Sequence, residues 1–176
     1  SHFGENYFQE AMEKIERLRE LNLKWHFIGS IQSNKTREIA QSFDWIQSLD
    51  REKIAVKLNE HRGNTLSALN VCVQVNLSGE ETKSGVPINQ ARELCELVEE
   101  LPNLKLRGLM AIPAPQPDFQ LQRIKFRELS RKFDDLKTNH PCIDILSMGM
   151  SNDFEAAIAE GSTMVRLGTA LFGGRL

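Results

Sequence analysis

Residues 69–77 read Leu-Asn-Val-Cys-Val-Gln-Val-Asn-Leu and give the clearest strand signal in the chain. The short length and the three valines favour a strand over a helix. The next segment places apolar residues at helical spacing, namely Ile88, Ala91, Leu94, Cys95, Val98 and Leu101. A strand followed at once by an amphipathic helix predicts a βα unit.

The βα unit repeats on both sides of this segment. Further strands are expected at residues 24–29, 44–49, 104–112, 143–148 and 163–167, and further helices at 7–21, 33–41, 50–60, 118–138 and 152–160. Ser33 and Asp50 are predicted to cap their helices, and Asn152 to form a capping box with Glu155. Strict alternation of strands and helices predicts a parallel sheet with right-handed crossovers.

The number and spacing of the strands decide between two α/β architectures. Six strands are readable, and residues 3–6 read as the end of a seventh. An open doubly wound sheet concentrates its glycines in one early phosphate loop. Here polar residues follow every strand instead, as at the rim of a barrel. We therefore predict an α/β fold, a (β/α)8 TIM barrel that lacks its first strand, with residues 1–176 as a single domain.

Composition excludes several classes of protein. The chain has 176 residues, 26% of them charged, with a net charge of −2, which argues against a nucleic-acid-binding protein. No apolar run reaches transmembrane length, and no signal peptide opens the chain. The three cysteines lie far apart and show neither a disulfide framework nor metal-ligand spacing. These features predict a cytoplasmic protein with no membrane partner.

An arginine inside the last strand marks the candidate site. Residues 163–170 read Thr-Met-Val-Arg-Leu-Gly-Thr-Ala, so Arg166 interrupts an apolar strand that runs into a turn. Such an arginine needs an anionic or hydrogen-bonding partner, and the turn offers backbone N–H groups. Together with Ser151 upstream, Gly168 and Thr169 predict a pocket for a phosphorylated small molecule. Helix capping by Ser151 and tight turning at Gly168 are equally compatible with the sequence.

Several motifs resemble the pyridoxal-phosphate homeostasis protein family. They span essentially the whole chain in order: Phe3-Gly4-Glu5-Asn6-Tyr7, Trp25-His26-Phe27-Ile28-Gly29, Gln32-Ser33-Asn34-Lys35, Lys83-Ser84-Gly85, Gly108-Leu109-Met110-Ala111-Ile112, Ser147-Met148-Gly149-Met150-Ser151 and residues 161–173. The resemblance implies the barrel of the alanine racemase N-terminal domain and binding of pyridoxal 5′-phosphate (PLP). It implies a role in PLP supply and homeostasis, with no established reaction.

The resemblance also implies roles for individual residues. Arg166 is expected to face the pyridine nitrogen of PLP and to keep it unprotonated. The other expected cofactor-binding residues are Asn6, His26, Met148, Ser151, Gly168 and Thr169. Other readings stay open: Arg166 paired with a carboxylate, Asn6 in a turn, and His26 as a hydrogen-bonded core residue.

One departure concerns the lysine to which the family attaches PLP as a Schiff base. That lysine lies upstream of the motif at residues 3–6, where this chain begins. We therefore expect an open gap between residues 3–6 and 163–167, and weak PLP binding without the covalent link. Lys83 and Lys35 follow strands and are the candidates for transient contact with an aldehyde, unless they are ordinary solvated loop residues.

The implied function is a non-catalytic PLP carrier or regulator. Its expected partners are PLP and PLP-dependent apo-enzymes, and its expected state is a monomer or weak homodimer. The alternative is a PLP-dependent amino-acid racemase, which needs a second base such as a tyrosine. The one tyrosine, Tyr7, is placed to start a helix. A phosphosugar enzyme would need paired carboxylates at strand ends, which the sequence does not offer.

Overall fold

Side chains alternate along the strand at residues 69–76 and so separate the two faces of the sheet. In the computed structural model, which describes residues 1–79 and 84–174, this strand is β4 (Leu69–Asn76). Its leucine and valines, Leu69, Val71, Val73 and Val75, are buried in the main hydrophobic core. Cys72 belongs instead to a small second cluster with Trp45 and Met110. Because successive side chains point to opposite faces, the second cluster marks the inner face of the sheet.

The strands and helices alternate as predicted. The strands are β1 (His2–Glu5), β2 (Lys24–Phe27), β3 (Trp45–Leu49), β4, β5 (Val86–Pro87), β6 (Leu104–Met110), β7 (Ile145–Met150) and β8 (Met164–Arg166). The helices are α1 (Phe8–Arg17), α2 (Thr36–Ser42), α3 (Glu52–Arg62), α4 (Ala91–Glu100), α5 (Phe119–Asn139), α6 (Phe154–Ala159) and α7 (Thr169–Phe172). The short elements β5 and α7 had no expected counterpart.

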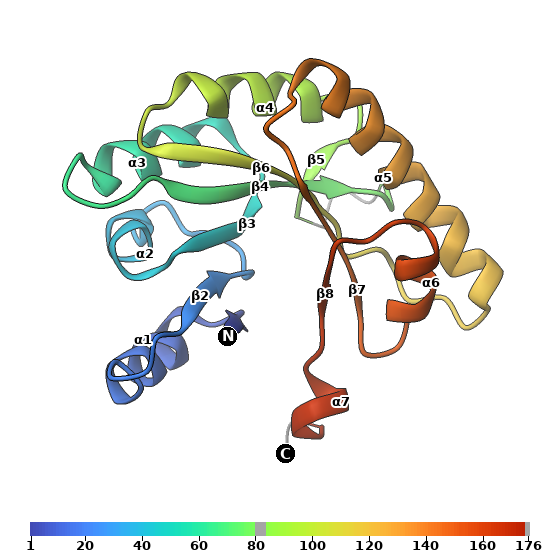
Figure 1. Cartoon of the computed structure of the whole chain (residues 1–176), viewed down its shortest axis with the longest axis horizontal. Helices are drawn as coiled ribbons and strands as arrows, with labels where there is room; N and C mark the ends of the chain where they lie inside the picture. The colour runs from blue at the N-terminus through green and yellow to red at the C-terminus, as the bar shows by residue number, and fades with distance from the viewer. Residues whose placement is uncertain (80–83, 175–176) are drawn as a thin grey trace.

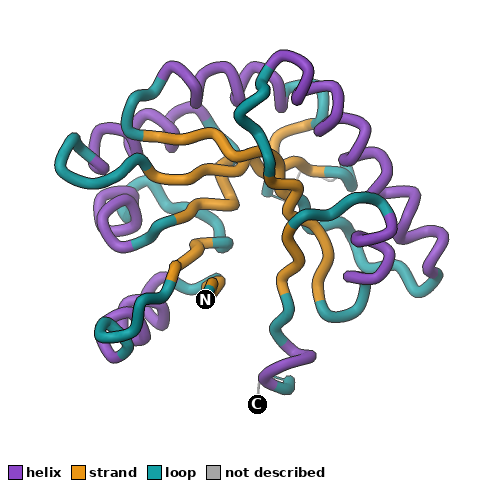
Figure 2. The backbone as a smooth tube through the Cα atoms, viewed as in Figure 1, coloured by secondary structure: helices purple, strands orange, loops and turns teal. Residues whose placement is uncertain are grey.

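The strands form one parallel sheet that curves into a nearly closed barrel. Its order is β1-β2-β3-β4-β6-β7-β8, with β5 paired to β4 alone. The strands gather inside and the helices lie outside them (Figures 1 and 2). β1 and β8 are the two edges, and the barrel is open between them in the lower part of Figure 1. The fold class and the expected opening are therefore confirmed.

Two of the predicted helix caps are wrong. α2 begins at Thr36 with Lys35, not Ser33, as its N-cap and no side-chain capping bond, and the Thr36 hydroxyl donates to the Ser33 carbonyl at 3.1 Å. α3 has Arg51 as its N-cap and no side-chain cap. Asp50 accepts a hydrogen bond from Arg51 Nε at 2.9 Å instead, because a charged neighbour competes with the backbone for the carboxylate.

The predicted capping box of Asn152 and Glu155 is also wrong. α6 starts two residues later, with Asp153 as its N-cap and no capping hydrogen bond from that side chain. The Asp153 carboxylate accepts from the Met150 N–H at 2.6 Å and closes the turn after β7. The turn geometry therefore delays the start of the helix.

None of the helices in the described part of the chain is long and apolar enough to span a bilayer.

Helix α4 buries the face that the sequence predicts, with Ala91, Leu94, Cys95 and Val98 against the core. Packing of such faces leaves the carboxyl ends of the parallel strands as the natural place for a site.

Candidate functional site

Arg166 is the last residue of β8 and points into the barrel interior. Its Nη1 donates to Ser147 Oγ at 2.6 Å and its Nη2 to the Ala111 carbonyl at 2.9 Å. Its Nε is buried and has no hydrogen-bond partner among the described residues. Burial lowers the pKa of Arg166 to about 10, opposed by the charge of Asp153. The guanidinium is therefore protonated at neutral pH, and Nε is its one nitrogen without a hydrogen-bond partner among the described residues.

The alternative of a structural ion pair finds no support among residues 1–79 and 84–174. Asp153 acts on Arg166 through its charge alone, and its own carboxylate takes the Met150 N–H. A half-buried cation without a hydrogen-bonded carboxylate is unusual in a protein interior. This arrangement is expected of a binding site in which a ligand supplies the hydrogen-bond acceptor for Arg166.

His26 lies in the interior and reaches Arg166 through two other side chains. It is 2% exposed, and its ring stacks on Trp45 with 4.9 Å between ring centres. Gln47 bridges His26 and Ser147, with contacts of 2.8 and 2.6 Å. Both imidazole nitrogens have partners, which fits the reading of His26 as a hydrogen-bonded core residue.

Ser151, Gly168 and Thr169 come together beyond the ends of β7 and β8. Gly168 is the N-cap of α7 and offers no side-chain cap, and Thr169 is the first helical residue. Ser151 Oγ accepts from the Ala170 N–H at 3.1 Å. Ser151 thus caps α7 rather than the helix that follows it in sequence. The first N–H groups of a helix have no intrahelical partner, so this cluster presents backbone donors.

Asn6 and Met148 lie apart from this cluster. Asn6 is exposed beyond β1, at the other edge of the sheet, and its carbonyl lies against Gly29 so closely that a Cβ there would be 1.9 Å away. The Met148 side chain is buried in the main hydrophobic core, on the face of β7 opposite Ser147. Its carbonyl accepts from Ser162 Oγ at 2.7 Å. Their expected contacts with a cofactor remain predictions.

Among the remaining candidates from the sequence, Lys35 and Tyr7 lie outside the barrel interior. Lys35 Nζ lies 3.4 Å from Glu38 and above the ring of Phe8, and Lys83 lies outside the described residues. Tyr7 is the N-cap of α1 and is 54% exposed. The described residues contain no group of three or more metal-ligating side chains.

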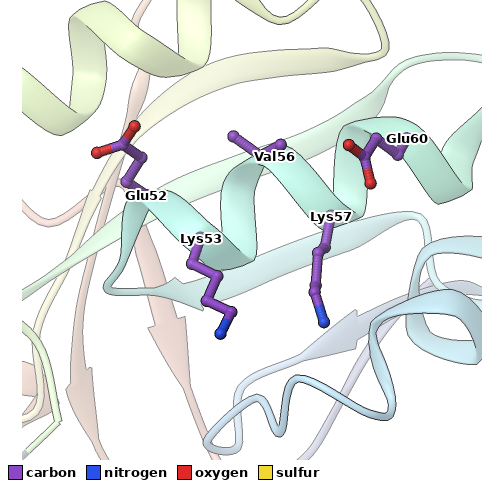
Figure 3. A pocket seen from close by; sticks show the side chains of 5 residues that line it. All are labelled: Glu52, Lys53, Val56, Lys57 and Glu60. Carbon is purple, nitrogen blue, oxygen red and sulfur yellow. The ribbon is translucent and has the colours of Figure 1, made fainter.

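Two hollows lie away from the candidate cluster. One of about 390 Å³ follows the outer face of α3, where Lys53 and Lys57 project from the same helix as its other lining residues (Figure 3). Its charges of both signs along one helix are typical of a solvated face. The other, of about 230 Å³, lies at the amino ends of β2–β4, where Arg107 forms a bidentate pair with Asp144. Neither hollow includes Arg166 or Ser151.

Sequence reasoning missed Gln47 and Ser147 as interior residues. Each is a polar residue inside an apolar strand, and period-two alternation places Ser147 opposite Leu146 and Met148. That alternation was the available signal. No local pattern could show that the two residues, 100 positions apart, form a hydrogen bond.

The sequence and the fold both place this chain with the N-terminal domain of alanine racemases. The family model described as alanine racemase, N-terminal domain, matches residues 1–176, and the chain belongs to this family. Alanine racemase of Clostridium difficile shares the fold, with a TM-score of 0.76 and 18% identity over 99% of this chain and 45% of that one.

Within this family the chain is one of the pyridoxal phosphate homeostasis proteins. It is 53% identical to the protein of that name from Escherichia coli, over 98% of this chain and 75% of the relative. It is 56% identical to the Pseudomonas aeruginosa protein of that name, over 98% and 74%. PipY of Synechococcus elongatus, solved with PLP bound, superposes with a TM-score of 0.89 and 35% identity, over 98% of this chain and 81% of PipY.

Proposed function

We propose that this protein binds PLP beyond the ends of β7 and β8 and serves PLP homeostasis as a non-catalytic carrier or regulator. The names of the Escherichia coli and Pseudomonas aeruginosa relatives and the PLP bound to PipY support this role. PLP-dependent apo-enzymes are the proposed recipients. A cytoplasmic location and a monomeric or weakly dimeric state complete the proposal.

The free Nε of Arg166 is the observation that carries the proposal. An unpartnered buried donor loses the hydrogen bond it would make in water, so a ligand acceptor placed there restores it. The unprotonated pyridine nitrogen of PLP is such an acceptor. Because Arg166 remains protonated at neutral pH, it would hold the ring nitrogen of bound PLP in its unprotonated form.

The residues beyond β7 and β8 fit the phosphate of the same molecule. Ser151 contributes a hydroxyl, and the turn at Gly168 and Thr169 contributes backbone N–H groups. Such donors favour an anion. When bound, PLP supplies an aldehyde and an electron-withdrawing ring. Arg166 would weaken that ring as an electron sink, which suits storage and delivery better than turnover.

The racemase alternative requires a second base in the interior. Tyr7 is the chain's one tyrosine, and its exposed position at the start of α1 does not supply that base. His26 is held by Gln47 and His2 and has no free nitrogen. A non-catalytic role therefore fits these residues better.

Equilibrium dialysis of the protein against PLP tests the proposed function. We expect saturable binding of one PLP per chain, competition by inorganic phosphate, and no racemisation of alanine when PLP is present. Absence of saturable binding would refute the proposal. Racemisation that disappears in a Tyr7→Phe variant would favour the enzyme instead.

A further inference from the structure

A continuous row of hydrogen-bonded side chains crosses the barrel interior from β8 to β1. Arg166 donates to Ser147, which lies 2.6 Å from Gln47 Oε1. Gln47 Nε2 lies 2.8 Å from His26 Nδ1, and His26 Nε2 lies 2.8 Å from His2 Nδ1. The members come from β8, β7, β3, β2 and β1, so the row connects the two edge strands of the sheet through side chains alone. We call these five residues the interior row.

Donor and acceptor chemistry gives the interior row a single direction. A guanidinium only donates, so Ser147 Oγ must accept from Arg166 and send its own proton to Gln47 Oε1. The amide is thereby oriented with its Nε2 toward His26. Nδ1 of His26 must then accept, and its Nε2 carries the proton that goes to His2. The positive charge of Arg166 therefore determines the tautomer of His26, which lies three hydrogen bonds away along the row.

Reversing the interior row would leave groups unsatisfied. A proton on Nδ1 of His26 would point at the amide N–H of Gln47, so two donors would oppose each other. Flipping the Gln47 amide would remove that conflict but would point its N–H at the Ser147 hydroxyl. The Ser147 hydroxyl would then have two donors and no acceptor for its own proton. An unsatisfied buried group of this kind costs about 1–3 kcal/mol. The second amide hydrogen of Gln47 is also used in the observed orientation, toward Met164 Sδ at 3.2 Å.

The groups around His26 agree with a neutral ring. His2 faces it from β1, Asp44 lies before β3, and Trp45 covers one ring face, with Arg107 on the far side of that indole. Burial and, to a smaller extent, the charge of His2 lower the pKa of His26 to about 4 against the opposing charge of Asp44. The ring is therefore uncharged at neutral pH, as the hydrogen-bond accounting requires.

We propose that Gln47 is a positioning residue for Arg166, and that the interior row holds His26 as the neutral tautomer with its proton on Nε2. Gln47 orients the Ser147 hydroxyl, and Ser147 with the Ala111 carbonyl holds the two Nη atoms. Nε is thereby left as the guanidinium nitrogen that has no hydrogen-bond partner among the described residues and can donate to a ligand. The consequence for PLP affinity rests on the proposed function, whereas the arrangement itself is a property of the ligand-free protein.

Nitrogen-15 NMR of the ligand-free protein tests the interior row. We expect His26 to show a bare Nδ1 and a protonated Nε2, and Arg166 to show a distinct, slowly exchanging Nε–H signal. Gln47→Leu should lose both signatures and bind PLP about tenfold more weakly. The matched control is Ser48→Ala, which removes a buried hydroxyl from the same strand that bonds only the Gly29 carbonyl. It should keep both signatures and the wild-type affinity.

Gln47→Glu serves if Gln47→Leu does not fold. An ionised glutamate still accepts from Ser147 but cannot donate to His26, so it should keep the Arg166 signal and raise the pKa of His26 above its wild-type value. A wild-type His26 protonated on Nδ1, or an unchanged Arg166 signal in a folded Gln47→Leu protein, would overturn the proposal. So would a His26 pKa that stays at the wild-type value in Gln47→Glu at a pH where the introduced carboxyl is shown to be ionised. Wild-type protein with both signatures but no PLP binding would support the interior row and refute only the proposed function.

Discussion

Replacement of Arg166 by methionine should separate binding from stability. Methionine has a similar unbranched length but no charge. The change removes two hydrogen bonds from a charged donor, which contribute roughly 1.5–3 kcal/mol each. It also removes the several kcal/mol needed to bury a cation without an ion pair. These terms nearly cancel, so we expect the free energy of unfolding to change by less than about 1 kcal/mol and PLP affinity to fall at least tenfold.

Arg62→Met is the matched control. Arg62 is also buried, but it donates to the carbonyls of Ser67, Ala40 and Phe43 at 2.6–2.8 Å. Its loss leaves three buried carbonyls without that donor, at about 1–3 kcal/mol each, whereas loss of Arg166 leaves one carbonyl and a hydroxyl that keeps Gln47. After the same relief from burying a cation, we therefore expect about 3 kcal/mol of destabilisation and unchanged PLP affinity for Arg62→Met. Urea unfolding measures the change in the free energy of unfolding for both variants, provided that the m value stays constant. The reasoning is refuted if Arg166→Met costs more than about 3 kcal/mol, because Arg166 would then be structural.

Two further substitutions test the frame around the site. Glu160 accepts hydrogen bonds from Arg123 and Arg127, which hold its pKa at about 2, so its contribution is present above pH 4.5 and is lost as pH falls toward 2. Glu160→Gln should therefore cost about 1 kcal/mol at pH 7 and almost nothing near pH 2, and urea unfolding showing the same deficit at both pH values would contradict this. Gly29→Ala would place a Cβ 1.9 Å from the Asn6 carbonyl and should cost about 1–3 kcal/mol in urea unfolding, whereas Gly174→Ala, which meets nothing within 4 Å, should be neutral. Equal effects of the two glycine substitutions would show that the close approach at Asn6 relaxes freely.

The sequence predicted the strands and helices because their signals are local. The valines of β4 and the apolar spacing of α4 follow the periods of a strand and a helix. The caps at Ser33, Asp50 and Asn152 failed because each depends on which neighbour takes the side chain or shapes the turn. Boundaries are therefore less predictable than the elements that they limit.

The site was only partly predictable for the same reason. Arg166 stood out as a charged residue in an apolar strand, and Ser151, Gly168 and Thr169 as small polar residues at strand ends. Gln47 carries no comparable signal, since its role arises from a hydrogen bond to a strand 100 residues away. Met148 was included with its motif, although alternation along β7 turns its side chain into the core.

The most direct measurement follows the Arg166 Nε–H signal during a titration with PLP, with inorganic phosphate as the comparison. PLP should shift this signal saturably, together with the backbone amides of Ser151, Gly168 and Thr169. Inorganic phosphate should shift the amides and leave Arg166 Nε unchanged, because it brings no ring nitrogen. PLP binding that leaves the Arg166 signal unmoved would contradict the claim that the buried guanidinium receives the cofactor.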